Sequence, residues 1–332
     1  MAANIAEVRL TLDDGTDLSD RINPRLIDLT LTEKRGEKAD ELQITLHNHD
    51  GKLAPPKTGV FLSLAMGWRQ GNDVTPGLVD KGRFKVDEVE RGGPPDIVSI
   101  RARSADLTGD YRKRRDQVWK DKTLGAILTE IAGRNALTAS VHPDLASTQI
   151  QSIAQSAKSD MAFVADLGRR YDAVASVKNK TLVFMPVGSA TTASGAAIPA
   201  LTLARRDGWS WKFTYAQRSE HDGAEAQWHD QDEAKTKTVK TGGNNRKRLK
   251  KTYASEADAN AAAKAEADKN KRGAKCFDYD LALGDPAIAV NSKVTLNGWD
   301  SEIDGTNWLV EEASHKFGSS GLSTSIRLES AD

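Results

Sequence analysis

Short runs in which apolar and polar residues alternate are the feature that most restricts how this chain can fold. In ELQITLHNHDG the apolar positions are Leu42, Ile44 and Leu46, and residues 5–12 and 26–31 show the same pattern. Period two places alternate side chains on one face of a strand. Turn sequences such as DDGT and GGPP separate the runs. We therefore predict that the first third of the chain is a sandwich or barrel of short strands.

An amphipathic helix is predicted directly after residue 122. In KTLGAILTEIAGRNAL, Thr123 is a suitable N-cap and Gly133 lies near the expected end. The apolar residues on one face of this helix are Leu124, Ile127, Leu128 and Ile131. Farther along, AVASVKNKTLVFMP reads as two short strands around a turn, which completes a compact α+β module.

A second helix of this module lies within residues 157–173. Ser159 can cap it, and Asp160 is favourable near the positive end of the helix dipole. Its apolar face, for which core packing is the expected role, consists of Met161, Val164, Leu167 and Tyr171. We interpret the Arg169-Arg170 pair at its end as a solvated terminus that complements the dipole, rather than as a ligand site.

Strand patterns resume after residues 187–200, whose small polar composition marks a boundary. In GWSWKFTYA, four aromatic residues alternate onto one face of the predicted strand: Trp209, Trp211, Phe213 and Tyr215. Such a row is either a stacking platform for sugars or bases or one side of a barrel core. Strict period two favours the core.

A basic stretch, residues 235–251, follows an acidic one. We interpret these charge blocks as solvated loops or flexible hairpins. The basic stretch lacks the recognition motif or interleaved aromatic residues of a nucleic-acid patch, and the whole chain carries 47 Lys plus Arg against 47 Asp plus Glu. We therefore expect no specific nucleic-acid binding.

An Ala-rich helix is predicted around residues 255–272. Ser255 and Asp258 have capping-box spacing, and Gly273 is a suitable stop. Because Ala side chains permit close approach, we expect this helix to lie tightly against another surface. Strand patterns return after it, so the helix interrupts a second β-barrel.

No catalytic, cofactor-binding or metal-binding residue is assigned. The single Cys276 cannot form an intrachain disulfide and is expected to be a buried or half-buried thiol. The only close His pair, His47-x-His49, lies in a turn context that favours solvation over weak metal binding. Known nucleophile, phosphate-loop and dinucleotide motifs are missing. No apolar run approaches the roughly 20 residues of a membrane helix, and the start has no signal-peptide pattern, so we expect no membrane insertion.

Taken in order, these segments resemble the phage late-control protein D family, which comprises the baseplate hub proteins of contractile tails. That family is related to the hub portion of VgrG proteins. The matching segments run from VRLTLDDGTDLSDRI to GTNWLVEEASHKFGSSGLSTSIRLE and cover nearly all 332 residues. The resemblance implies a β-rich α+β fold with two tail-tube-like β-barrels, at residues 1–105 and 191–332. A peripheral α+β module, residues 106–190, lies between them, and the helical insertion interrupts the second barrel.

The resemblance also implies a function. It is that of a structural, non-enzymatic hub that trimerises to adapt the hexameric tail tube to the trimeric central spike. Tape-measure and baseplate wedge proteins are further expected partners. Because the sequence ends at SIRLESAD, where VgrG chains continue, we expect a separate spike protein. We also expect synthesis in the host bacterial cytoplasm and assembly into the virion tail or an equivalent particle. A cell-wall-directed carbohydrate-binding or lytic tail protein is the alternative that the aromatic row leaves open.

Overall fold

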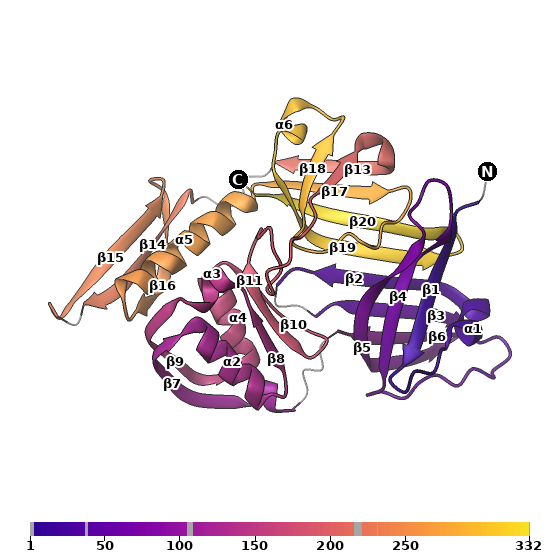
Figure 1. The fold of residues 1–332 in the computed structure, drawn as a ribbon, viewed down its shortest axis with the longest axis horizontal. Coiled ribbons are helices and arrows are strands. Elements are labelled where there is room, and N and C mark those ends of the chain that lie inside the picture. The colour runs from indigo at the N-terminus through magenta and orange to yellow at the C-terminus, as the bar shows by residue number, and fades with distance from the viewer. Residues whose placement is uncertain (1–2, 37–38, 105–108, 216–220, 231, 332) are drawn as a thin grey trace.

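The computed structural model describes residues 3–36, 39–104, 109–215, 221–230 and 232–331. Strands dominate it, and both ends of the chain contribute to one large sheet (Figure 1). Two smaller α/β parts, one formed by residues 109–186 and the other by strands β14–β16 with helix α5, lie to the left of this sheet in Figure 1. The predicted β-rich α+β class is therefore confirmed.

The N-terminal unit contains six strands in the spatial order β1-β4-β5-β6-β3-β2. These strands are β1 (Ile5–Leu12), β2 (Leu26–Lys34), β3 (Glu41–His47), β4 (Phe61–Gln70), β5 (Gly77–Gly92) and β6 (Ile97–Arg103). The short helices α1 (Ser19–Ile22) and η1 (Asn23–Arg25) precede β2. Leu42, Ile44 and Leu46 are buried in its core, which confirms the predicted alternation.

The C-terminal unit repeats that connectivity, with the order β12-β18-β19-β20-β17-β13. Its strands are β12 (Leu201–Ala204), β13 (Gly208–Tyr215), β17 (Lys275–Leu281), β18 (Lys293–Asn297), β19 (Trp308–Gly318) and β20 (Gly321–Ser330), and its short helices are η3 (Arg205–Asp207) and α6 (Ser301–Asp304). In both units the first strand neighbours the fourth, followed by the fifth, sixth, third and second. One difference is that β12 runs parallel to β18, whereas β1 is antiparallel to β4.

Neither unit closes into a barrel through hydrogen-bonded ladders among the described residues. Instead, β2 pairs antiparallel with β19, so the two units share a twelve-stranded sheet. The outer edge of β2 is therefore occupied by the other unit and does not return to β1. The expectation of two β-barrels is therefore not confirmed: the described residues form two similar open units.

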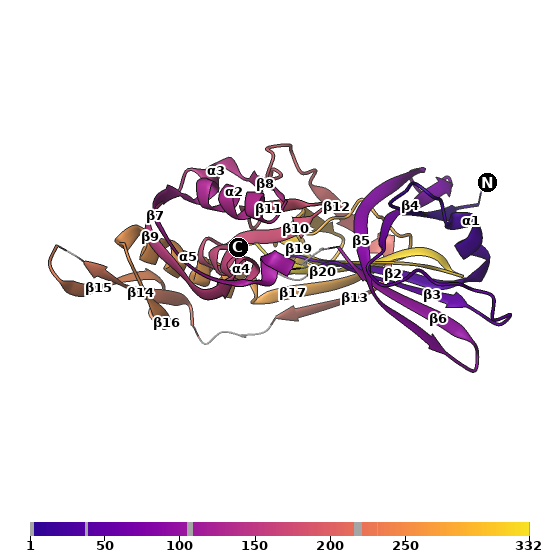
Figure 2. The same ribbon diagram turned by 90° about the horizontal axis from the view of Figure 1, so that it is seen from below.

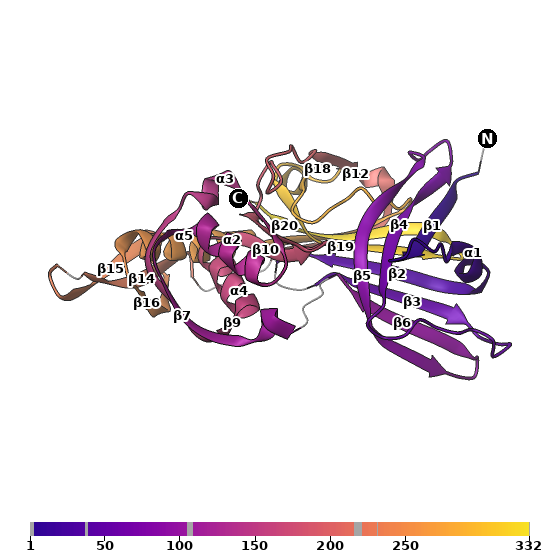
Figure 3. The ribbon, with the colours of Figure 1, turned by 60° about the horizontal axis from the view of Figure 1, so that its bottom comes forward.

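The middle of the chain forms the module that contains both predicted amphipathic helices. Its elements are η2 (Gly109–Arg112), β7 (Arg114–Thr123), α2 (Leu124–Arg134), β8 (Thr138–Val141), α3 (Pro143–Ala146), β9 (Gln149–Ser159), α4 (Asp160–Arg170), β10 (Ala173–Lys178) and β11 (Thr181–Pro186). The curved β7–β9 pair wraps around α2 and α4 (Figure 3). The predicted caps are confirmed, because Thr123 accepts from the Ala126 amide and Ser159 from the Ala162 amide, each at 3.2 Å. The long strands β7 and β9 were not predicted.

A separate small sheet carries the Ala-rich helix. Strands β14 (Gly223–Asp230), β15 (Lys235–Gly242) and β16 (Arg246–Tyr253) have the order β15-β14-β16, and α5 (Glu256–Arg272) covers one face. Buried Ala262 and Ala263 pack against Ala224 and Ala226 of β14, which confirms the predicted close packing.

The prediction of solvated loops or a flexible hairpin for residues 235–251 is wrong. This stretch supplies β15 and most of β16, which flank β14 on opposite sides. The physical reason is that β-branched Thr and Val alternate with Lys in β15, and Val239 is buried under α5 while Lys240 is exposed to solvent. The insertion therefore has its own core and does not simply interrupt a barrel.

Candidate assembly surface

Strand β13 is an exposed edge of the twelve-stranded sheet. One side pairs with β17, and the other has no strand partner in the part of the chain that the structure describes. Figure 2 shows β13 as the outermost strand along the lower margin of its unit. Unpaired edges invite pairing with another chain, so this edge is a candidate for assembly.

The aromatic row lies on β13, but it does not form one side of a closed core. Trp209 is 79% exposed, Tyr215 69% and Trp211 41%, while Phe213 is half-buried. The core interpretation is therefore wrong for most of the row. It fails because β13 is the last strand of the sheet, so nothing among the described residues covers its outer side.

The inner part of the row is held by aromatic contacts. The Trp211 ring stacks on Phe277 with centroids 5.9 Å apart and meets Trp299 edge to face at 6.3 Å, and Phe213 meets Trp308 edge to face at 6.3 Å. These contacts fix the position of β13 side chains whose other surfaces face solvent. Rigid, partly exposed Trp and Tyr side chains are typical anchors of protein interfaces.

A second free edge lies in the C-terminal half of β5. Strand β4 pairs with Gly77–Lys85, whereas β6 pairs with Lys85–Gly92 on the other side. Residues 87–92 therefore have no strand partner on the β4 side among the described residues. The side chains of Asp87, Glu88 and Glu90 are exposed; Asp87 pairs with Arg103 of β6 at 3.2 Å and Glu88 with Arg101 at 3.0 Å.

A buried ionic cluster fixes the two units to each other where β2 meets β19. Glu33 of β2 contacts Lys81 at 2.5 Å and His315 Nε2 of β19 at 3.3 Å, and the other ring nitrogen of His315 lies 2.9 Å from the Thr324 hydroxyl. Burial alone would raise the pKa of Glu33, but the hydrogen bond with His315 and the charges of Lys81 and Lys178 lower it to about 2.

The middle module is tied to the same cluster. Lys178 of β10 contacts Asp40 at 2.8 Å and Glu33 at 3.9 Å. Burial raises the pKa of Asp40 although the Lys178 charge opposes this effect. His315 is fully buried, and burial lowers its pKa despite the Glu33 hydrogen bond. These contacts join three parts of the chain and leave the carboxylates occupied.

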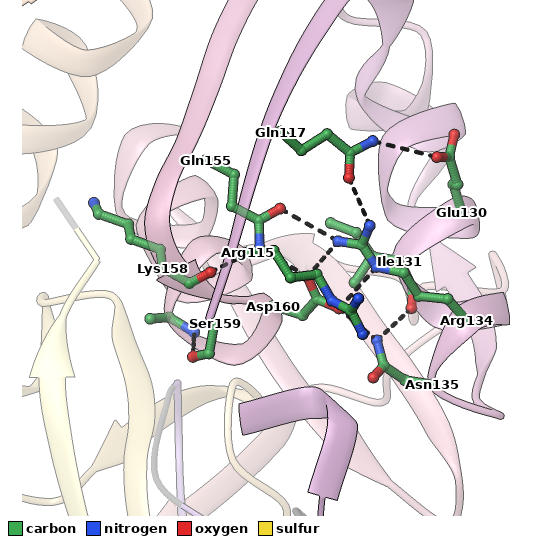
Figure 4. A network of polar contacts seen from close by, with 11 residues as sticks. Arg115, Gln117, Glu130, Ile131, Arg134, Asn135, Gln155, Lys158, Ser159 and Asp160 are labelled. Atoms are coloured by element: carbon green, nitrogen blue, oxygen red, sulfur yellow. Dashed lines mark hydrogen bonds and ion pairs between the residues drawn. The ribbon is translucent and has the colours of Figure 1, made fainter. Parts of the chain in front are cut away.

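Asp160, which we placed at the dipole of its helix, is also the centre of a buried network (Figure 4). Its carboxylate accepts hydrogen bonds from Arg134 Nε, Asn135 Nδ2 and Gln155 Nε2, each at 2.8 Å, and Arg115 Nε lies 3.5 Å away. Burial would raise the pKa of Asp160, but these hydrogen bonds lower it. The saturated carboxylate positions helices and strands rather than a substrate.

The interpretation of Arg169-Arg170 as a solvated terminus holds for the first residue only. Arg169 is 53% exposed, whereas the side chain of Arg170 is 7% exposed and contacts Asp258 of α5 at 2.5 Å. The Arg170 guanidinium also lies 5.0 Å from the Tyr253 ring centroid. Arg170 is buried because the insertion formed by β14–β16 and α5 packs against this end of α4.

No metal site emerges among the residues with described positions, since no group of three or more His, Cys, Asp or Glu side chains could hold an ion. His47 and His49 are exposed beside the turn after β3, and Cys276 is half-buried as predicted. Within the same residues, every helix is too short or too polar to cross a membrane.

Comparison with known proteins identifies the family. The model of the phage tail baseplate hub (GPD) family matches residues 41–321. A probable baseplate hub protein of Escherichia phage 186 is 37% identical, and the match covers 96% of this chain and 92% of that protein.

Solved structures share the fold at low sequence identity. The tail protein from Neisseria meningitidis MC58 has a TM-score of 0.68 at 11% identity, with 98% of this chain and 96% of that chain covered. A chain of the Francisella PdpA–VgrG complex has a TM-score of 0.53 at 8% identity, with 99% of this chain and 58% of that chain covered. Together with the full-length similarity to the phage protein, the family match shows that this chain belongs to the phage tail baseplate hub family.

Proposed function

We propose that this protein is the structural, non-enzymatic hub of a contractile phage tail or a phage-derived injection system. Three copies form a ring that adapts the hexameric tail tube to the trimeric central spike. One observation carries this proposal: a single chain holds two six-stranded units with the same strand order. Three chains therefore present six similar units, which suits a sixfold partner on one side and a threefold partner on the other.

The similarity of the two units extends to their irregularities, which supports the proposal. A bulge interrupts the pairing of β5 with β6 between Val86 and Glu88, and the pairing of β19 with β20 between Val310 and Glu312. A shared bulge at the same strand position is a specific feature of a fold rather than a general property of sheets.

We further propose a division of labour along the chain. Residues 1–105 and 191–332 supply the two tube-like units of the ring. The module at residues 106–190, with the α5 insertion docked on it, lies outside the ring and braces neighbouring parts such as wedge proteins. The saturated Asp160 network and the buried Arg170–Asp258 pair support a mechanical role, because they fix elements without leaving a reactive group free. The protein is then a component of the assembled virion tail.

The test is co-expression with the spike protein of the same particle, followed by light scattering after size exclusion. We expect a complex of three hub and three spike chains. Monomeric hub that never associates with the spike would contradict the proposal. The exposed Trp209 and Trp211 side chains favour a cell-wall-directed carbohydrate-binding or lytic protein as the alternative. Peptidoglycan pull-down and clearing of cell-wall suspensions by the purified chain would support that alternative, whereas a hub gives neither.

A further inference from the structure

The partner of the β13 edge is inferred from how the equivalent strand of the other unit is used. Strand β2 pairs with β3 through a bulge between Leu26 and Asp28, and β13 pairs with β17 through a bulge between Gly208 and Ser210. Aligning the two strands at the bulge makes Thr214 the equivalent of Thr32. Strand β2 uses its outer edge to pair with β19, whereas the outer edge of β13 has no strand partner among the residues that the structure describes.

Strands β5 and β19 are equivalent by the same reasoning. Beyond the shared bulge, the backbone of Val86 exchanges hydrogen bonds with Gly59 and Val60 at 2.7 and 2.8 Å. The backbone of Val310 does the same with Asn291 and Ser292 at 2.8 and 3.0 Å. Aligned at these valines, Glu90 of β5 corresponds to Ser314 of β19.

We propose that β13 of one copy pairs antiparallel with residues 87–92 of β5 in the next copy, in the register that β2 and β19 have within one chain. Inside the chain, Thr32 is opposite Ser314. The transferred register therefore places Thr214 opposite Glu90, and Tyr215 opposite Val89. This inference rests on the proposed ring and specifies the contact that closes it.

Exposure differences between the two units support this pairing. Ala313 and His315 of β19, which β2 covers, are fully buried. Their equivalents, Val89 and Arg91 of β5, are half-buried and exposed. Within the described parts of the chain, no strand covers this edge of β5 as β2 covers β19.

Charge complementarity also supports β5 of the next copy as the partner of the β13 edge. Lys212 is the cation of β13, and the transferred register places it opposite Gly92, diagonal to Glu90 of the neighbour. Diagonal pairs on one face of a sheet lie within reach of long side chains. A head-to-tail contact of this kind hides one β13 edge and one β5 edge per chain, and it closes when the rotation between copies permits a ring.

Engineered disulfides test the register. Facing residues of an antiparallel pair have Cα atoms about 4.5–5.5 Å apart, which suits a disulfide. A chain carrying Glu90→Cys and Thr214→Cys, co-expressed with the spike protein and oxidised, is expected to run as a covalent trimer on non-reducing gels. The matched control, Arg91→Cys with Thr214→Cys, shifts the pair by one residue and points the thiols to opposite faces, so it should give no covalent trimer. Every cysteine variant also carries Cys276→Ser, because Cys276 of β17 faces Thr214 within the chain and would otherwise form a disulfide with the new thiol.

Light scattering of the same samples separates the two possible failures. A trimer that forms without the Glu90–Thr214 cross-link, or that cross-links equally in the control, would overturn the strand pairing and leave the ring intact. Absence of any trimer would overturn the proposed function itself. In a mixture of two single variants, Glu90→Cys and Thr214→Cys, a covalent dimer is expected. A cross-link formed only within one chain would refute the pairing.

Discussion

Replacing Arg170 with Met tests whether the insertion is fixed to the middle module by one buried ion pair. The Arg170 guanidinium lies 2.5 Å from Asp258 Oδ1, and both side chains are almost completely buried. The Tyr171 hydroxyl also donates to Asp258 Oδ1 at 3.1 Å. In the variant, the Asp258 carboxylate stays buried next to the Tyr171 hydroxyl and the N-terminus of α5, which Ser255 caps. It loses its only described cationic partner, the Arg170 guanidinium.

Breaking a buried pair by removing one partner costs about 3–5 kcal/mol, because the remaining charge is desolvated without compensation. The neighbouring residue supplies a matched control. Arg169 is half-exposed and pairs with Asp166 at the surface, so Arg169→Met should cost about 0–1 kcal/mol. The two substitutions delete the same chemical group one position apart on the same helix.

Hydrogen exchange followed by mass spectrometry provides the assay, since it reports on each part of a multi-part chain separately. Amides of α5 and of β14–β16 should exchange roughly 100-fold or more faster in Arg170→Met, at about 1.4 kcal/mol per tenfold change. Amides of the twelve-stranded sheet should change much less. Equal exchange rates in the Arg169→Met and Arg170→Met variants would contradict the prediction that the buried Arg170–Asp258 pair stabilises the insertion more than the exposed Arg169–Asp166 pair.

Three further predictions concern other parts of the chain. The pKa of Glu33 is lowered from 4.5 to about 2 in the folded protein, so its contribution to stability is present above pH 4.5 and is lost as the pH falls toward 2. In urea unfolding measured at a series of pH values, Glu33→Gln should therefore reduce the loss of unfolding free energy between pH 4.5 and 2. An unchanged loss would contradict this prediction. Tyr215→Ala should change the unfolding free energy by less than about 0.5 kcal/mol because the side chain is mostly exposed, yet weaken trimer formation by about 2 kcal/mol because the proposed pairing places it opposite Val89 of the next copy; the concentration dependence of mass measures this. Ala263→Leu should destabilise the insertion by about 1–3 kcal/mol through overpacking against β14, while Ala257→Leu on the exposed side of α5 should not, and equal melting curves would refute the close packing.

Local signals in the sequence predicted much of the fold. The alternation of Leu42, Ile44 and Leu46 identified a strand, and the caps at Thr123, Ser159 and Ser255 identified three helix starts, because both signals depend only on neighbouring residues. The overlap of the predicted helix at 255–272 with α5 has the same explanation.

Features that depend on distant residues were missed. The burial of Arg170 follows from its contact with Asp258, 88 positions away, and nothing near Arg170 in the sequence announces this. The exposure of the β13 aromatic row depends on β13 being the last strand of a sheet, which is a matter of strand order. The family resemblance implied two similar units, but their common strand order could not be read from the residues, because equivalent positions share little identity, as Leu31 and Phe213 illustrate.

The most direct test of the ring is the structure of the hub inside an assembled particle, determined by electron cryomicroscopy. We predict three copies around the spike, six similar β units facing the tube, and β13 of each copy beside β5 of the next. A hub with a different number of copies, or with the β13 and β5 edges both facing solvent, would contradict it.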